Sequence, residues 1–226
     1  MAIGTRIEQR LQTIQGRMDE ACLRRKASWP KPKLLAVSKK QSSAAIREAY
    51  ALGLREFGEN YVQELQGKAE EFADLPELRF HLIGHLQRNK TKQALACSSV
   101  VQSVDSLGLL QRLAGQHEAA TPLDIFIQVN LAGESQKSGC DPNELEALVD
   151  EAKKHKSIRL LGLMMVPPFG EAEKNRLLFR QLRRLADHYG LEDCSMGMSD
   201  DFEVAIEEGA TLVRIGTALF GPRQHK

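Results

Sequence analysis

The strongest constraint on the fold of this sequence is an alternation, repeated eight times, of short apolar segments with longer segments of helical pattern. The apolar segments predict strands at residues 34–37, 55–57, 79–83, 100–104, 124–131, 158–166, 194–196 and 211–215. Strands that alternate with helices form a parallel sheet covered by those helices. Eight such units favour an α/β fold of the closed (β/α)8 type, the TIM barrel, over an open doubly wound sheet, although two of the strands are short.

The N-terminal residues predict one additional helix outside this alternation. Apolar residues follow one another at spacings of three and four, at Ile3, Ile7, Leu11, Ile14 and Met18, which places them on one face of a helix over residues 3–25. Because this helix precedes the first strand, we expect residues 1–28 to pack outside the barrel. A chain of 226 residues with 42% hydrophobic residues is long enough for one large core, so we expect residues 1–226 to form a single domain.

Charge and apolar runs exclude several classes of partner. The formal net charge of +1 gives no field that would attract nucleic acid or an anionic membrane. There is no signal-peptide pattern, and the longest apolar run, 160–166, is far shorter than the roughly 20 residues of a bilayer span. We expect a cytoplasmic protein, a monomer, whose ligand is a small molecule. Its isolated cysteines do not predict a zinc site and are expected as free thiols: Cys22, Cys97, Cys140 and Cys194.

A lysine at the end of the first predicted strand is the leading candidate for a functional side chain. The apolar strand 34–37 runs directly into Ser38, Lys39 and Lys40, at the carboxyl end where parallel α/β folds bind their ligands. Burying a lysine costs several kcal/mol unless its amine is deprotonated, pairs with an anion or forms a covalent bond. The alternative interpretation is a lysine that ends its strand and reaches solvent.

Side-chain alternation separates the two lysines. Lys39 shares a face with Leu35 and Val37, whereas Lys40 falls on the other face, and alternation alone does not say which face is the interior. This pattern favours Lys39 as the functional residue. The remaining role for Lys40 is that of a nearby cation that lowers the pKa of its neighbour.

The segments after the seventh and eighth strands carry the residues of a phosphate site. In barrels of this type, phosphate is often bound there by a short helix. Ser199 supplies a hydroxyl after the seventh strand, and Arg214, Gly216 and Thr217 follow one another at the end of the eighth. Gly216 lets the backbone approach an anion closely, and Thr217 adds a second hydroxyl. The alternative is that these residues are ordinary caps and turns.

Closure of a barrel would bring this segment next to Lys39. The eighth strand pairs with the first, about 4.8 Å away. A reactive amine, a phosphate cradle and an arginine between them suggest pyridoxal 5′-phosphate (PLP), held as a Schiff base on Lys39 with Arg214 facing the ring nitrogen and keeping it unprotonated. Asn60, after the second strand, reaches the cofactor in one interpretation and is a helix N-cap in the other. A different phosphorylated metabolite remains a further alternative.

Other polar residues are interpreted as structural. His81 and His85 are four residues apart, but a strand ends between them, so they are not expected to bind metal. Asp200 and Asp201 are interpreted as carboxylates of a first helical turn. The arginines at 176, 180, 183 and 184 are interpreted as a solvated helix face. A minority hypothesis makes Lys137 an acceptor of the aldehyde from Lys39 during release.

Several long motifs occur in the order of a known family. They are LLAVSK, FGENYVQE, FHLIGHLQRNK, VNLAGESQKSG, LLGLMMVP and GMSDDFEVAIEEGATLVRIGTALFG, and they extend from Leu34 to Gly221. In these motifs the sequence resembles the YggS/PROSC-type pyridoxal phosphate homeostasis proteins. The resemblance implies a barrel of the alanine racemase N-terminal type with PLP on the lysine of VSK, which is Lys39. It also implies phosphate contacts at Ser199, Gly216 and Thr217, and Arg214 at the ring nitrogen.

The resemblance favours a carrier over an enzyme. Racemases of the related fold take a tyrosine base from a second domain, whereas only five residues follow Gly221 and none is a tyrosine. A Schiff base without a paired acid and base is a poor catalyst of proton abstraction. We therefore expect a protein that binds PLP, maintains its intracellular level and supplies it to apo-enzymes. A PLP-dependent amino acid racemase or lyase is the alternative.

Overall fold

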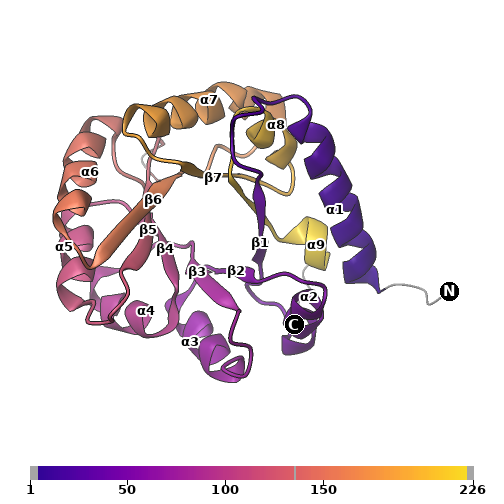
Figure 1. The fold of residues 1–226 in the computed structure, drawn as a ribbon, viewed down its shortest axis with the longest axis horizontal. Helices are drawn as coiled ribbons and strands as arrows, with labels where there is room; N and C mark the ends of the chain where they lie inside the picture. The colour runs from indigo at the N-terminus through magenta and orange to yellow at the C-terminus, as the bar shows by residue number, and fades with distance from the viewer. Residues whose placement is uncertain (1–4, 135, 223–226) are drawn as a thin grey trace.

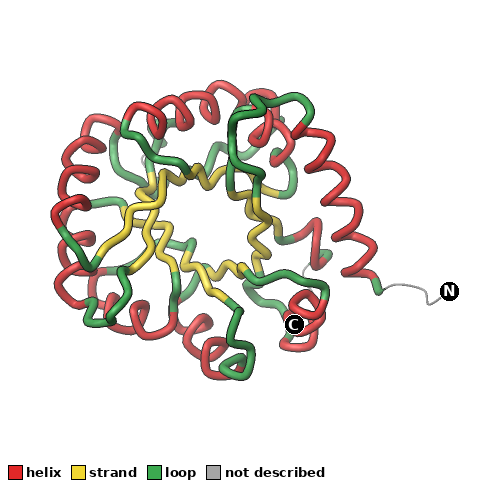
Figure 2. The backbone as a smooth tube through the Cα atoms, in the orientation of Figure 1, coloured by secondary structure: helices red, strands yellow, loops and turns green. Residues whose placement is uncertain are grey.

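Eight parallel strands close into a ring, and helices surround it (Figures 1 and 2). The computed structural model describes residues 5–134 and 136–222. The strands are β1 (Lys33–Val37), β2 (Glu56–Glu59), β3 (Arg79–Leu82), β4 (Val100–Val104), β5 (Leu123–Gln128), β6 (Ile158–Met164), β7 (Asp193–Met198) and β8 (Leu212–Ile215). Each strand pairs with its neighbours in sequence, and β8 pairs with β1. The predicted (β/α)8 barrel is thus confirmed.

The helices form the outer layer of the barrel (Figure 2). In the described residues they are α1 (Arg6–Cys22), α2 (Ser43–Ala51), α3 (Val62–Glu71), the 3-10 turn η1 (Arg88–Lys90), α4 (Thr91–Cys97), α5 (Leu107–Gln116), the 3-10 turn η2 (Pro142–Glu144), α6 (Leu145–Lys154), α7 (Ala172–His188), α8 (Phe202–Glu207) and α9 (Thr217–Phe220). None of them is long and apolar enough to cross a membrane.

Strand boundaries differ from the sequence prediction mainly at the carboxyl ends. β2 extends to Glu59 because Gly58 and Glu59 continue the pairing with β3, although neither residue type favours a strand. β5 ends at Gln128, before the glycine-bearing loop, and β6 ends at Met164, ahead of two prolines that cannot donate to a ladder. These shifts move the ends of the strands, where the loops begin, without changing their order.

Two packing layers show which face of each strand is the interior. Leu35, Val100, Phe126, Met164 and Leu212 form one buried cluster. They come from β1, β4, β5, β6 and β8, and residues of strands so far apart in the ring can touch only across its interior. Residues of opposite parity belong to the larger layer between strands and helices. Leu35 therefore points into the barrel, which resolves the ambiguity that alternation leaves along β1.

The N-terminal helix packs outside the ring, against α8, α9 and α2 (Figure 1). Its buried face consists of Ile7, Leu11, Ile14 and Met18. These match the predicted stripe, whereas Ile3 lies outside the described residues. Helix α1 begins with Thr5 as N-cap, whose hydroxyl accepts a hydrogen bond from the Glu8 amide.

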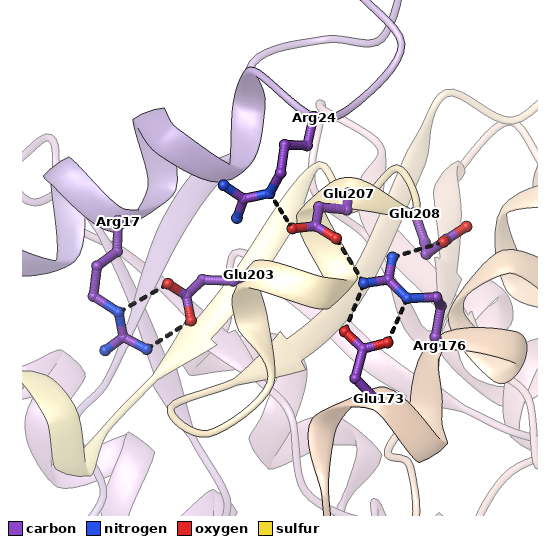
Figure 3. Close-up of polar contacts among 7 residues, drawn as sticks. All are labelled: Arg17, Arg24, Glu173, Arg176, Glu203, Glu207 and Glu208. Carbon is purple, nitrogen blue, oxygen red and sulfur yellow. Dashed lines mark hydrogen bonds and ion pairs between the residues drawn. The ribbon is translucent and has the colours of Figure 1, made fainter.

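A row of glutamates on and after α8 ties that helix to its neighbours (Figure 3). Arg17 of α1 makes a two-pronged ion pair with Glu203, at 3.1 and 2.8 Å, and Arg24 pairs with Glu207 at 2.6 Å. From the other side, Arg176 of α7 reaches Glu207 at 2.7 Å and Glu208 at 3.0 Å. Helix α8 is thereby fixed between α1 and α7, and with it the segment that joins β7 to α8.

One arginine of α7 contradicts the predicted solvated face. Arg183 is only 4% exposed. Its guanidinium donates to the carbonyl oxygens of Leu191 and Glu192, at 2.6 and 2.9 Å, and pairs with Asp187. The prediction was wrong here because the chain turns back at Gly190, and the carbonyls of that turn cover the guanidinium.

Candidate functional site

The carboxyl ends of β1, β7 and β8 bring several predicted residues together. Ser199 follows β7, and its hydroxyl accepts a hydrogen bond of 3.3 Å from the amide of Ala218, in the first turn of α9. Gly216 and Thr217 immediately precede that amide. The two halves of the predicted phosphate site, after β7 and after β8, thus lie side by side.

Strand pairing places residues 214–217 beside the carboxyl end of β1, which Lys39 follows. Leu35 is in register with Arg214 and Ala36 with Ile215. A Cβ atom on Gly216 would lie 3.4 Å from the Cβ atom of Val37, which is ordinary van der Waals contact. Lys39 follows Val37 by two residues, so it continues from β1 at the same edge.

Contacts of the preceding residue orient Lys39. The hydroxyl of Ser38 donates to Glu59 Oε1 at 2.6 Å, and Lys68 of α3 donates to the carbonyl of Ser38, so Ser38 faces the helical layer. The amide of Ser38 continues the ladder by donating to the Gly58 carbonyl. Because side chains alternate along extended backbone, we expect the side chain of Lys39 on the opposite face, that of Leu35 and Arg214. Its side chain is half-buried.

Lys40 occupies a different environment. It is exposed, and its φ of 59° lies in the left-handed region. The amide of Gln41 donates to the Ser38 carbonyl at 3.0 Å, which closes a turn over Lys39 and Lys40. β1 ends at Val37, and Lys39 and Lys40 are the two central residues of the turn that follows it.

Arg214 is a buried cation held by neutral groups. It is 4% exposed, and its two terminal nitrogens donate to the Ser195 hydroxyl at 2.8 Å and to the Met165 carbonyl at 2.7 Å. Burial lowers the pKa of Arg214 to about 10, while the charge of Asp201 opposes that effect. No ion pair with Arg214 occurs within residues 5–134 and 136–222. A buried guanidinium without a carboxylate partner is stabilised by a ligand that offers it a hydrogen-bond acceptor with a lone pair.

Behind Arg214, hydrogen bonds cross the barrel interior. The Ser195 hydroxyl donates to Gln102 Oε1 at 2.7 Å, Gln102 Nε2 lies 2.7 Å from His81 Nδ1, and His81 Nε2 lies 2.5 Å from Glu56 Oε2. With His81 neutral and protonated on Nε2, every group donates in the same direction, from Arg214 to the carboxylate of Glu56. Sequence reasoning missed this relay.

The pKa shifts of His81 and Glu56, at the far end of the relay from Arg214, fit this assignment. Burial lowers the pKa of His81, against the raising effect of Glu56, which favours the neutral imidazole. Burial tends to raise the pKa of Glu56, but the hydrogen bond from His81 and the charges of Arg79 and Lys33 lower it overall. The relay thus runs between a buried cation and an ionised carboxylate through neutral groups. His81 is thus a buried histidine of the barrel interior.

Asn60 follows β2, which flanks β1 on one side while β8 flanks it on the other, so Asn60 lies at the same mouth of the barrel. Val37 is in register with Gly58, so Asn60 follows Gly58 by the same two residues as Lys39 follows Val37. A Cβ atom on Gly84 would lie 2.1 Å from the carbonyl oxygen of Asn60, so only glycine fits there. The N-cap alternative is wrong, because α3 begins after Tyr61 and has no side-chain cap.

The remaining polar candidates have structural contacts. Asp201 accepts hydrogen bonds from the Met198 amide at 2.7 Å and from Asn175 at 3.1 Å, which fixes the turn between β7 and α8. Lys137 pairs with Glu134 at 2.5 Å and donates to the Pro167 carbonyl. In the part of the chain that the structure describes, no cluster of side chains could hold a metal ion, and the cysteines are free.

Comparison with known proteins first identifies the class of barrel. Residues 15–224 match the family described as alanine racemase, N-terminal domain, so the chain belongs to this class. Alanine racemase from Corynebacterium glutamicum superposes with a TM-score of 0.66 over 94% of this chain and 62% of its own, at 17% identity. That likeness shows the shared fold alone.

Closer relatives then define the family within this class. The chain is 52% identical over 196 residues, 85% of each protein, to the pyridoxal phosphate homeostasis protein of Pseudomonas aeruginosa. It is 41% identical over 227 residues to that of Aquifex aeolicus, covering 96% of this chain and 98% of the relative. The structure of PipY from Synechococcus elongatus with PLP bound has a TM-score of 0.84 and 38% identity, covering 96% and 100%. The chain belongs to the family of pyridoxal phosphate homeostasis proteins.

Proposed function

We propose that this protein binds PLP covalently on Lys39, at the carboxyl ends of β1, β7 and β8, as part of intracellular PLP homeostasis. The observation that carries the proposal is the convergence of three groups: Lys39 in the turn that follows β1, the buried guanidinium of Arg214 on β8, and the hydroxyl of Ser199 beside α9. The similarity to PipY, whose structure has PLP bound, supports the same ligand.

The chemistry of these side chains fits the cofactor. The aldehyde of PLP condenses with a lysine amine with loss of water, which makes a covalent linkage that hydrolysis reverses. Ser199, Gly216 and Thr217 are assigned to the phosphate, because the two hydroxyls and the side-chain-free backbone lie together there. Asn60 is assigned to the opposite side, since it follows the neighbouring strand β2 at the level at which Lys39 follows β1.

Arg214 is assigned to the ring nitrogen. A guanidinium donates hydrogen bonds but does not accept them, and with a pKa of about 10 it stays protonated at neutral pH. It therefore presents N–H groups to a nitrogen lone pair and keeps that nitrogen unprotonated. A neutral ring withdraws electrons weakly, which suits a protein that stores the cofactor better than one that abstracts protons from amino acids.

The visible absorption spectrum with added PLP tests this assignment. We expect a Schiff-base band in the wild type and in Lys40→Ala, and its loss in Lys39→Ala. Borohydride reduction followed by peptide mass spectrometry should place the trapped adduct on Lys39. A band that survives in Lys39→Ala, or an adduct on another lysine, would overturn the assignment.

We also propose that the bound cofactor is supplied to apo-enzymes, and that the protein works in the cytoplasm as a monomer. Burial raises the pKa of the Cys140 and Cys194 thiols to about 12, and all four cysteines are free, which suits a reducing compartment. Light scattering after size-exclusion chromatography checks the monomer. Recovery of activity by an apo-enzyme mixed with the loaded protein, in the presence of a phosphatase that destroys free PLP, tests delivery.

A PLP-dependent amino acid racemase or lyase is the alternative function. Incubation of the loaded protein with alanine and other amino acids separates the two. Rapid turnover would favour the enzyme; its absence, together with delivery to an apo-enzyme, favours the carrier.

A further inference from the structure

The turn that presents Lys39 has an unfavourable backbone conformation. Among the described residues, Lys40 is the one non-glycine residue with a positive φ, at 59°. A residue with a Cβ atom loses free energy in this region, because the Cβ atom crowds the following carbonyl. Such strain persists only where surrounding groups hold it, and it tends to occur at functional sites.

A buried cluster on the outer side of β1 holds this turn. The amine of Lys68, on α3, donates to the Ser38 carbonyl at 2.7 Å, to Glu59 Oε1 at 2.7 Å and to Glu64 Oε1 at 2.8 Å. Glu64 Oε1 also accepts the amide of Lys40 at 2.5 Å. The carbonyl that precedes Lys39 and the amide that follows it are therefore bound to one cluster.

Burying the charged groups of this cluster costs free energy. Lys68 is 8% exposed and Glu59 fully buried, and Glu59 Oε2 has no hydrogen-bond partner among the described groups. Buried ion pairs of this kind are commonly no more stabilising than apolar side chains of the same volume. Apolar side chains could not form hydrogen bonds with the Ser38 carbonyl and the Lys40 amide, the two backbone groups that flank Lys39. The contacts thus point to a role in the geometry of the turn.

We propose that Lys68 is a positioning residue, which with Glu59 and Glu64 holds the turn 38–41 in its left-handed conformation and so directs Lys39 into the mouth of the barrel. This inference rests on the proposed function, in which Lys39 bonds the cofactor. If the turn relaxed, the contacts to the phosphate and the ring would stay in place. The amine of Lys39 would, however, be oriented for attack on the aldehyde less often. The rate of covalent capture should therefore fall more than the affinity for the phosphate end.

Stopped-flow absorbance after mixing with PLP measures this rate. Glu64 lies towards the surface, so Glu64→Leu should fold while it removes the acceptor for the Lys40 amide, and Glu64→Gln keeps an acceptor oxygen as the matched control. We expect capture about tenfold slower in Glu64→Leu, the effect of losing a hydrogen bond to a charged group, and near wild type in Glu64→Gln. The paired variant Lys68→Met with Glu59→Gln removes the buried charges together and should slow capture similarly.

Glycine at position 40 distinguishes positioning from general stability. Glycine adopts a positive φ without steric cost, so Lys40→Gly should restore capture in the Glu64→Leu background to within about twofold of wild type. Thermal unfolding is recorded alongside, and hydrogen exchange of the Lys40 amide reports the turn directly. A purely structural cluster would lower the unfolding temperature, leave the capture rate unchanged and gain nothing from glycine.

The outcomes separate this inference from the proposed function. Wild-type capture rates in Glu64→Leu and in the paired variant, with no capture in Lys39→Ala, would overturn the role of Lys68 and leave the function standing. Slow capture that glycine does not relieve would also overturn it. Capture in Lys39→Ala at the wild-type rate would overturn the proposed function itself.

Discussion

The hydroxyl of Ser195 donates a hydrogen bond of 2.7 Å to Gln102 Oε1, from β7 to β4 across the inside of the barrel. This contact is the middle of the relay that links Arg214 to Glu56. The relay reaches Arg214 through the Ser195 hydroxyl, and the Met165 carbonyl accepts from the other terminal nitrogen of the guanidinium. Polar groups of the interior are thus arranged to fix one cation rather than to fill the core.

Replacing Gln102 by leucine should therefore weaken the binding of PLP, although Gln102 is not among the residues assigned to contact it. Ser195 and His81 each lose a partner, so we expect the free energy of unfolding to fall by about 1–3 kcal/mol and the dissociation constant for PLP to rise several-fold. Urea unfolding and a titration followed by absorbance measure the two effects. Ser103→Ala is the control, because the Ser103 hydroxyl is buried without a partner on the next position of β4. Equal PLP affinities in Gln102→Leu, Ser103→Ala and wild type would contradict the role of the relay.

Two buried arginines allow a test of what Arg214 is for. Arg214→Met removes a buried charge that no carboxylate neutralises, so the relieved desolvation offsets one unpaired carbonyl, and we expect the free energy of unfolding to change by about 1 kcal/mol or less. The affinity for PLP should fall about tenfold or more as the ring nitrogen loses its donor.

Arg183→Met is the matched comparison. It leaves Asp187 and two carbonyl oxygens without their partner, so the protein should be destabilised by about 2 kcal/mol or more while its PLP affinity stays unchanged. If both variants lose stability and affinity in parallel, Arg214 has no separate function in binding.

The sequence predicts the strand order and the carboxyl ends of β1 and β8, because apolar periodicity and the residues after each strand are local properties, whereas β7 ends at Met198, two residues later than predicted. It does not predict which side chains meet inside the ring. The pairing of β4 with β5 and of β7 with β8 shifts in register, between Val101 and Val104 and between Ser195 and Met198. Alternation along one strand places Gln102 on the interior face with Val100, but it cannot reveal that Ser195 lies opposite it.

Lys68 was missed for a different reason. It stands on a short amphipathic helix among glutamates and glutamines, a pattern typical of a solvated face. Only the packing of α3 under the end of β1 places its amine beneath the Ser38 carbonyl. The signal that was available is the group of polar residues Glu59, Glu64 and Lys68 in and after the FGENYVQE motif, at helical spacing from 64 to 68.

Acid should destabilise the protein partly through the glutamate row at α8. Hydrogen bonds from Arg180 and Arg176 lower the pKa of Glu208 below its ordinary 4.5, in spite of the opposing effect of burial. A carboxyl group with a lowered pKa in the folded state contributes stability that is complete above the ordinary value and lost as the pH falls through the lowered one. In Glu208→Gln, the difference from wild type should be largest at pH 7 and shrink below about pH 4.5. Urea unfolding at several pH values measures it, and a difference that grows in acid would contradict this sign.

Gly197 offers the sharpest test of how the β7 end is positioned. Its φ is +90°, and a Cβ atom there would lie 2.6 Å from the Cβ atom of Ala205 and 3.0 Å from the Cα atom of Phe202, both on α8. Gly197→Ala must therefore push α8 away from β7 and adopt a strained backbone, and Ser199, two residues on, should move off the amide of Ala218. We expect a loss of about 2 kcal/mol or more in the free energy of unfolding and weaker binding of PLP.

Gly16→Ala is the control for this substitution. Gly16 is on α1 with open space around its Cα atom, so alanine there should stabilise the helix by about 1 kcal/mol and leave PLP binding unchanged. Inorganic phosphate can then be titrated against PLP as a competitor in both variants. If the phosphate end of the site lies at Ser199 and Thr217, Gly197→Ala should weaken competition by phosphate, whereas Gly16→Ala should not. Unchanged competition in Gly197→Ala would place the phosphate elsewhere in the mouth of the barrel.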